Sequence, residues 1–186
     1  MQPGLSFPPV RATWLPAPVV PVDLPLRWRA AVDSDLAFFR HLYGLLRADE
    51  LAAVPWPEAA RTAFLDSQFA LQHHHYTTHF ADADFLVIEC GDEPVGRLYV
   101  SRRPEEVHII DIALLPCARG RGWGGALLRH VLATAANEGV GCVRLHVEQR
   151  NLAARRLYER LGFTVDGPSG HHWRMSWSAP VAAPVS

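Results

Sequence analysis

The chain has 186 residues, of which 49% are hydrophobic and 20% charged, and its formal net charge is -1. This length and hydrophobic content fit one globular domain with a sizeable core. The near-neutral charge argues against a surface that coats nucleic acid or an anionic membrane. All 18 basic residues are arginines, which excludes a pyridoxal phosphate Schiff base and the lysine of a Walker phosphate loop.

Cysteine usage and hydropathy predict a reduced, cytoplasmic protein. Cys90, Cys117 and Cys142 are odd in number and never spaced as CxxC, so neither a disulfide framework nor a zinc knuckle is indicated. No apolar run approaches the roughly 18 residues that span a bilayer. The N-terminus also lacks the basic start and apolar stretch of a signal peptide. We therefore expect no membrane and no nucleic-acid partner.

Both ends of the chain are rich in proline. Residues 1–25 contain seven prolines, which prevent helix and central strand alike, so an extended or disordered arm is expected. Within this arm Trp14 and Leu15 could attach it locally. Residues 179–186 form a similar loose tail. The predicted folded domain therefore spans residues 26–178.

Between the two ends, apolar periodicity and turn residues predict helices and strands in a mixed order. Asp33 or Ser34 is the candidate N-cap of the first helix, and Trp56-Pro57 opens the second. In chain order we expect a strand at 26–32, a helix after residue 34, a helix at 57–79, strands at 84–90, 95–101 and 107–115, a helix between Gly125 and Gly139, a strand at 142–148, a helix at 151–161, and short strands at 163–165 and 173–177.

The run 107–115 is apolar without clean alternation, which is typical of a central strand covered on both faces. It is followed by a helix and then by the strictly alternating run 142–148. A strand, a crossover helix and a strand make this unit parallel and right-handed. The fold class expected is a single α/β domain with a mixed sheet.

A glycine-rich turn, Arg119-Gly120-Arg121-Gly122-Trp123-Gly124-Gly125, lies between that strand and the helix. Its glycines free backbone amides to converge on an anion at the positive end of the helix dipole, which predicts a pyrophosphate cradle. Arg119 and Arg121 either add charge at its rim or are solvated loop residues. The glycines also satisfy GxGxxG, with Glu148 as a ribose acid, but a dinucleotide fingerprint usually follows the first strand of a longer βα series.

The longer pattern resembles the GNAT superfamily of N-acetyltransferases. Arg119-x-x-Gly122-x-Gly124 follows a strand ending Ile112-Ala113-Leu114-Leu115-Pro116, and Asn151 through Leu157-Tyr158-x-x-Leu161-Gly162-Phe163 comes after it. The resemblance is specific over residues 110–163 and weaker over 26–109. It implies a splayed central sheet flanked by helices, and acetyl-CoA as the acetyl donor. The implied cofactor site comprises the backbone of Leu114 and Leu115, the loop Arg119–Gly125, Asn151 and Tyr158.

Acetyl transfer to an amine requires two proton movements. An alkyl ammonium has a pKa near 10, so a base must take a proton before the nitrogen attacks the thioester, and the departing thiolate benefits from a proton donor. The resemblance implies that Tyr158 is this donor, although a helix tyrosine with a surface hydroxyl is the alternative. Asn151 is an N-cap, a ligand contact, or both.

The candidate bases are His146 and His108. The resemblance implies a catalytic Glu near these positions in relatives that acetylate protein N-termini or histones, so the histidines keep the proton-acceptor chemistry but leave the substrate open. Asp111, inside an apolar strand, is either a hydrogen-bonded structural residue or functional. Glu148 orients a neighbour or faces solvent. Cys117 has no obvious base, so we expect direct attack without an acyl-enzyme.

The cluster His73-His74-His75 predicts no metal site. Successive helical residues point about 100° apart, and only His75 with His79 has usable i, i+4 spacing. If this helix covers the cleft as in the family, Gln72, His73 and Tyr76 could line an acceptor pocket. The sequence leaves the acceptor open as a small-molecule or peptide amine, and leaves open a homodimer. A CoA-binding module without turnover is the non-enzymatic alternative.

Overall fold

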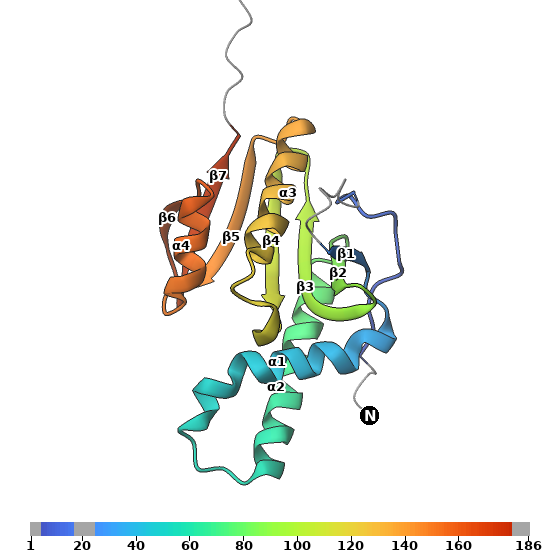
Figure 1. The fold of residues 1–186 in the computed structure, drawn as a ribbon, viewed down its shortest axis with the longest axis vertical. Coiled ribbons are helices and arrows are strands. Elements are labelled where there is room, and N and C mark those ends of the chain that lie inside the picture. Colours follow the sequence, from blue (N-terminus) through green and yellow to red (C-terminus); the bar gives the residue numbers. More distant parts are fainter. Residues whose placement is uncertain (1–4, 17–24, 180–186) are drawn as a thin grey trace, which may run out of the picture.

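The computed structural model describes residues 5–16 and 25–179 and contains one seven-stranded sheet, in the order β1-β2-β3-β4-β5-β7-β6 (Figure 1). The elements are β1 (Leu26–Ala30), α1 (Leu36–Ala52), α2 (Glu58–His79), β2 (Asp84–Cys90), β3 (Glu93–Arg102), β4 (Glu106–Leu114), α3 (Trp123–Asn137), β5 (Cys142–Glu148), α4 (Leu152–Arg160), β6 (Thr164–Ser169) and β7 (His172–Ser178).

This order confirms the predicted fold class and the parallel pairing of β4 with β5. The other pairs in the sheet are antiparallel. Pro116 opens a short 3-10 turn directly after β4, because proline cannot continue the strand's hydrogen bonding. Among the described residues, no helix has the length and hydrophobicity needed to cross a bilayer.

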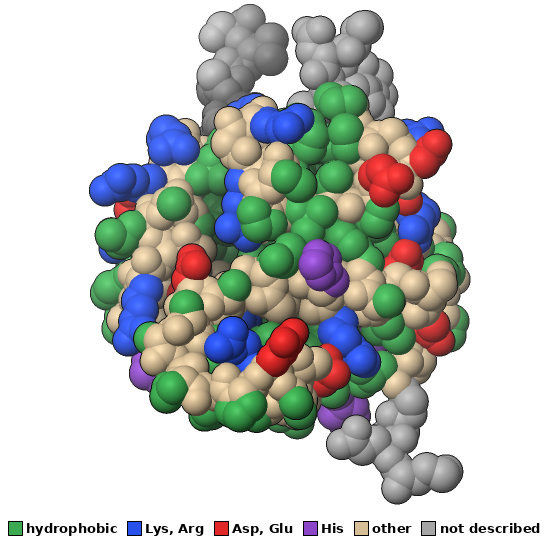
Figure 2. Space-filling view, turned by 60° about the horizontal axis from the view of Figure 1, so that its bottom comes forward, with side chains coloured by type: hydrophobic (Ala, Val, Ile, Leu, Met, Phe, Trp, Pro, Cys, Tyr) green, Lys and Arg blue, Asp and Glu red, His purple; other side chains and the backbone are tan. Residues whose placement is uncertain are grey.

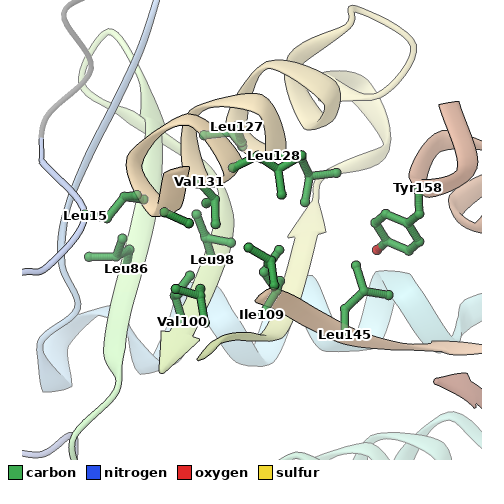
Figure 3. Close-up of a cluster of buried hydrophobic side chains, with 14 of the residues drawn as sticks. Leu15, Leu86, Leu98, Val100, Ile109, Leu127, Leu128, Val131, Leu145 and Tyr158 are labelled. Atoms are coloured by element: carbon green, nitrogen blue, oxygen red, sulfur yellow. The ribbon is translucent and has the colours of Figure 1, made fainter. Parts of the chain in front are cut away.

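The helices cover both faces of the sheet and define two cores. The larger core lies under α3 and extends to Tyr158 of α4 (Figure 3). The smaller, aromatic core lies under α1 and α2 and includes Phe39, Phe69 and Tyr99. Because β3 and β4 are covered on both sides, their apolar side chains are buried without clean alternation.

A gap opens between β4 and β5. The two strands pair only over Glu106–Ile109 and Cys142–Leu145. On the other side of β4, Ile110 is an extra residue, since Tyr99 pairs with Asp111 and Val100 with Ile109. Such a bulge bends the strand and re-aims its side chains. Beyond it β4 and β5 diverge, which is the predicted splay of the sheet.

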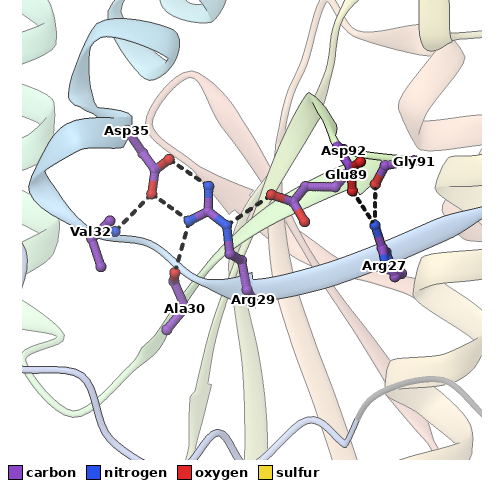
Figure 4. A network of polar contacts seen from close by, with 8 residues as sticks. All are labelled: Arg27, Arg29, Ala30, Val32, Asp35, Glu89, Gly91 and Asp92. Atoms are coloured by element: carbon purple, nitrogen blue, oxygen red, sulfur yellow. Dashed lines mark hydrogen bonds and ion pairs between the residues drawn. The ribbon is translucent and has the colours of Figure 1, made fainter.

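The start of α1 is attached to the sheet by a charged network (Figure 4). The Arg29 guanidinium donates to both carboxylate oxygens of Asp35, at 2.7 and 2.8 Å, and to Glu89 at 2.8 Å. Burial opposes ionisation of Asp35, but hydrogen bonds from Arg29 and the Val32 amide lower its pKa below the usual value. The prediction that Asp33 or Ser34 is the N-cap of α1 was wrong. A 3-10 turn, Asp33–Asp35, precedes the helix, the N-cap is Asp35, and Asp33 accepts from the Phe7 amide at 2.8 Å.

The described part of the proline-rich arm, residues 5–16, contains neither helix nor strand. Leu15 is fully buried in the larger core, and Trp14 packs against that core. The rest of the arm, and the predicted tail beyond Ala179, lie outside the described residues.

Candidate active site

A cavity of about 570 Å³ lies where β4 and β5 diverge. Side chains from both faces of the sheet reach it, because the gap between the strands joins the two sides. Its wall combines titratable and polar residues from α1, α2, β3, β4, β5 and α4, among them Tyr43, Gln72, Tyr76, Arg97, His108, Asp111, His146, Glu148, Asn151 and Tyr158. The cavity therefore brings together Tyr158, the predicted acid, with the two predicted bases, His108 and His146. Asn151, the predicted N-cap of α4, also lines it.

The glycine turn follows β4 and the short 3-10 turn Pro116–Ala118, and it leads into α3. Gly120 and Gly122 have φ values of 73° and 78°, and Gly122 is the N-cap of α3. These left-handed conformations favour glycine. The first bond of α3 joins the Ala126 amide to the Gly122 carbonyl, so the amides of the first helical turn have no partner within the helix. Unpaired amides at the positive end of the helix dipole form an anion site.

Two other glycines in the turn allow close packing. A Cβ on Gly125 would lie 3.3 Å from Arg129 and 3.5 Å from Leu157, and one on Gly124 would lie 3.7 Å from Leu157. Trp123 is buried, and the Arg121 guanidinium lies 5.2 Å from the centre of its ring. The loop therefore combines backbone amides that have no partner within the helix with close packing against α4. Its role as an anion site stays a prediction.

The end of β4 already has partners for part of its backbone. The Leu115 amide donates to the Val95 carbonyl at 2.8 Å, and the Leu114 carbonyl accepts from Arg119 Nε at 3.0 Å. A ligand that pairs with this segment would share the Leu114 carbonyl with the Arg119 side chain or displace that side chain. The roles predicted for Leu114, Leu115 and Arg119 in cofactor binding stay predictions.

Tyr158 projects from α4 toward Leu145 and Ile109 (Figure 3) and is only 7% exposed. The alternative of a surface hydroxyl is therefore wrong. Burial, followed by the nearby negative charge of Asp111, raises the pKa of Tyr158. The phenol stays protonated at neutral pH and can serve as a proton donor. At the start of α4 Asn151 accepts from the Ala154 amide at 3.1 Å, so its N-cap role is present while ligand contact stays a prediction.

The two candidate bases lie side by side on β4 and β5, with ring centres 5.7 Å apart. Burial, and secondly the charge of His146, lower the pKa of His108 to about 4. Burial, and secondly the charge of His172, lower the pKa of His146. Both imidazoles are therefore neutral at pH 7, which is the form that accepts a proton.

Asp111 faces a residue that the sequence analysis missed. Arg97 of β3, with a side chain 3% exposed, donates to the Asp111 carboxylate at 2.6 Å and to Gln72 Oε1 at 3.0 Å. Its guanidinium also lies 5.3 Å from the centre of the Tyr99 ring. Asp111 is thus hydrogen-bonded and also part of the cavity wall. The sequence did contain a signal for this pair. Arg97 is a single positive charge among the apolar residues of one strand, and Asp111 is a single negative charge among those of the next.

Among the described residues, those of the histidine-rich part of α2 included, no group of three or more His, Cys, Asp or Glu side chains is placed to hold a metal ion. The rings of His75 and His79 lie 4.3 Å apart. On the face in Figure 2, charged side chains of both signs are scattered among hydrophobic ones.

Comparisons with known proteins fit this geometry. The acetyltransferase (GNAT) family model matches residues 41–163. An uncharacterized N-acetyltransferase of Mycobacterium bovis is 34% identical over 64% of this chain and 85% of its own length. The mycothiol acetyltransferase of Corynebacterium efficiens is 39% identical over 47% of this chain. The crystal structure of PaiA N-acetyltransferase from Thermoplasma acidophilum with coenzyme A has a TM-score of 0.64 at 16% identity, covering 83% of this chain and 99% of that one.

The fold is that of a class of enzymes that transfer acetyl groups from acetyl-CoA. The chain belongs to the acetyltransferase (GNAT) family, as the sequence predicted. Its match covers only 30% of the Corynebacterium mycothiol acetyltransferase and 32% of that from Thermobispora bispora, about a third of each.

Proposed function

We propose that this protein is an acetyl-CoA-dependent N-acetyltransferase that moves the acetyl group to a primary amine by direct attack in a ternary complex. The observation that carries the proposal is the course of β4. The strand runs from the cavity wall at Asp111 into the glycine turn at the start of α3. A pyrophosphate bound by the amides of that turn would leave the thioester end of acetyl-CoA free to extend along β4 toward Tyr158.

In this mechanism the Tyr158 hydroxyl gives its proton to the CoA thiolate as the tetrahedral intermediate collapses. Neutral His146 is the proposed acceptor of the proton that the incoming ammonium loses before attack. The second proton leaves the nitrogen after attack and reprotonates the phenolate that Tyr158 becomes when it protonates the thiolate, so the amide and CoA form with one proton left on His146. His108, deeper and with a pKa near 4, is the weaker base. Replacing His146 with Gln should remove the acid limb of the pH–rate profile, and an unchanged profile would exclude it as the base.

Two carboxylates, each paired with an arginine, lie at the acceptor end of the cavity. Asp111 is held by Arg97, while Glu148 of β5 faces Arg47 of α1, with 3.7 Å between charged atoms. We propose that the Asp111 carboxylate is the counter-ion of the acceptor ammonium and that Arg97 fixes its position. A cation entering a partly buried site is stabilised by a fixed carboxylate more strongly than in water. The acceptor class is a small-molecule or peptide amine.

The test is release of CoA from acetyl-CoA in the presence of an amine panel. The panel includes small polyamines, amino acids, peptides with free N-termini and the acceptor of the mycothiol acetyltransferases. Release that depends on one amine, with the acetylated product seen by mass spectrometry, supports the proposal. CoA binding with no release for any acceptor at several pH values would instead favour a binding module without turnover.

A further inference from the structure

The described part of the proline-rich arm, residues 5–16, passes from one face of the sheet to the other. It is called the arm below. Near its start, Leu5 and Phe7 pack against the aromatic core under α1 and α2. Near its end, Leu15 is buried in the core under α3. The arm crosses at the beginning of β2, where one Asp84 carboxylate oxygen accepts from Thr13 Oγ1 at 2.7 Å and from the Trp14 amide at 2.8 Å. These contacts attach each end to a different layer.

Ser6 and Phe7, near the start of the arm, contact α2 at one buried residue, His73. His73 is 4% exposed, and its Nε2 lies 2.8 Å from the Ser6 carbonyl oxygen. Since a carbonyl only accepts, Nε2 is the protonated nitrogen. The Phe7 ring stands edge-on to His73 with centres 4.7 Å apart, and also contacts Phe39 of α1 and Phe85 of β2, both at 5.7 Å. Phe7 therefore lies between α1, α2 and the sheet.

The same segment of α2 forms a wall of the active-site cavity. Gln72 directly precedes His73 and accepts from Arg97, the partner of Asp111. Tyr76, one turn beyond Gln72, also lines the cavity. A helix moves as a rigid unit over one turn, so a shift at His73 is passed to Gln72 and Tyr76. The arm is therefore mechanically connected to the amine end of the cavity.

We propose that the arm is a positioning element for the acceptor: Phe7 and Ser6 fix α2 so that Gln72, Arg97 and Asp111 present one defined amine site. This inference rests on the proposed function. The other end of the arm serves only stability, because Leu15 and Trp14 contact the large core and Glu138, just after the C-terminal end of α3. The glycine turn lies at the opposite end of that helix.

The two ends supply matched variants. Phe7→Ala should raise the KM for the best amine of the panel about fivefold or more, because a loosened α2 must be ordered on binding, and leave the Kd of CoA within about twofold. Leu15→Ala removes a buried side chain from the same arm and should lower the melting temperature without changing that KM. Phe7→Leu, which keeps an apolar contact, should restore most of the affinity and serves if Phe7→Ala does not fold.

Hydrogen exchange separates this inference from the proposed function. Phe7→Ala should speed exchange of the α2 amides around His73 by about tenfold, and Leu15→Ala should not. If no amine is acetylated, the proposed function fails, while faster exchange confined to Phe7→Ala still supports the hold on α2. Unchanged acceptor KM in Phe7→Ala, an equal rise in Leu15→Ala, or unchanged α2 exchange overturns the inference.

Discussion

The phenol of Tyr158 is buried between α4 and the gap in the sheet, and its raised pKa keeps it protonated. Tyr158→Phe removes only the hydroxyl, so we expect kcat to fall by about 10²-fold, a typical contribution of a positioned acid. The KM for acetyl-CoA should change little. Steady-state CoA release measures both. Wild-type turnover in Tyr158→Phe would argue against Tyr158 as the acid.

His108 links stability to pH. The unfolded chain binds a proton near pH 6.5, but folded His108 does so only near pH 4, because burial disfavours the charged ring. Between these values the unfolded state holds more protons, so stability is full above about pH 6.5 and falls as the pH drops toward 4. The loss is at most on the order of 3 kcal/mol at about 1.4 kcal/mol per pKa unit.

Urea unfolding of wild type and His108→Gln across this pH range measures that contribution. The variant should lose less stability between pH 6.5 and 4. His41→Gln, at an exposed position of α1, should behave like wild type. A wild-type slope retained in His108→Gln would show that other groups cause the acid sensitivity.

For Arg97 and Asp111, the contribution of the buried pair to stability can be separated from its contribution to acceptor binding. Asp111→Asn leaves the Arg97 charge buried without its counter-ion, which typically costs about 3–5 kcal/mol. Replacing both, as Arg97→Met with Asp111→Leu, should restore most of the stability, because apolar residues of similar volume often replace a buried ion pair at no net cost. Asp111→Asn should also raise the KM for the acceptor amine, and this KM should stay raised in the double variant. Recovery of that KM together with stability would contradict the role of Asp111 as counter-ion.

At the scale of elements, the N-terminus of α3 can be tested by comparing two glycines of the same helix region. Gly122 at its start and Gly139 after its end have φ values of 78° and 72°, and a Cβ on either meets nothing within 4 Å. Alanine at each position should therefore cost a similar 1–2 kcal/mol or so through backbone strain alone. Only Gly122→Ala should weaken CoA binding in calorimetry, since residue 122 is the N-cap of α3, where the CoA diphosphate is proposed to bind, and Gly139 lies beyond the other end of that helix. Equal CoA affinity in the two variants would exclude the glycine turn as the binding site of the CoA diphosphate.

The elements were predictable because each carries its own local signal. Strict alternation in Cys142–Glu148 predicted β5, and Pro116 and Gly139 marked ends of β4 and α3. The glycine turn was visible as a motif in the sequence, whereas the proton-donor role of Tyr158 was implied by the resemblance to the GNAT superfamily and stays a prediction. Contacts between distant segments were not, because nothing local in Phe7 specifies His73 and nothing local in Arg97 specifies Asp111. These pairings follow from the closure of the whole sheet.

At the scale of the molecule, the proposed cradle and the proposed acid lie on two helices of the same layer, α3 and α4, and we expect them to make separable contributions. A ligand at 100 times its Kd stabilises the folded state by about 2.7 kcal/mol, which for a chain of this size raises the melting temperature by roughly 5–10 °C. We expect this shift with CoA in wild type and in Tyr158→Phe alike, because the phenol does not hold the diphosphate. Gly122→Ala should reduce it. A full shift in Tyr158→Phe with lost turnover shows that binding by α3 and proton transfer from α4 are independent, whereas loss of both would mean that the splayed sheet couples them.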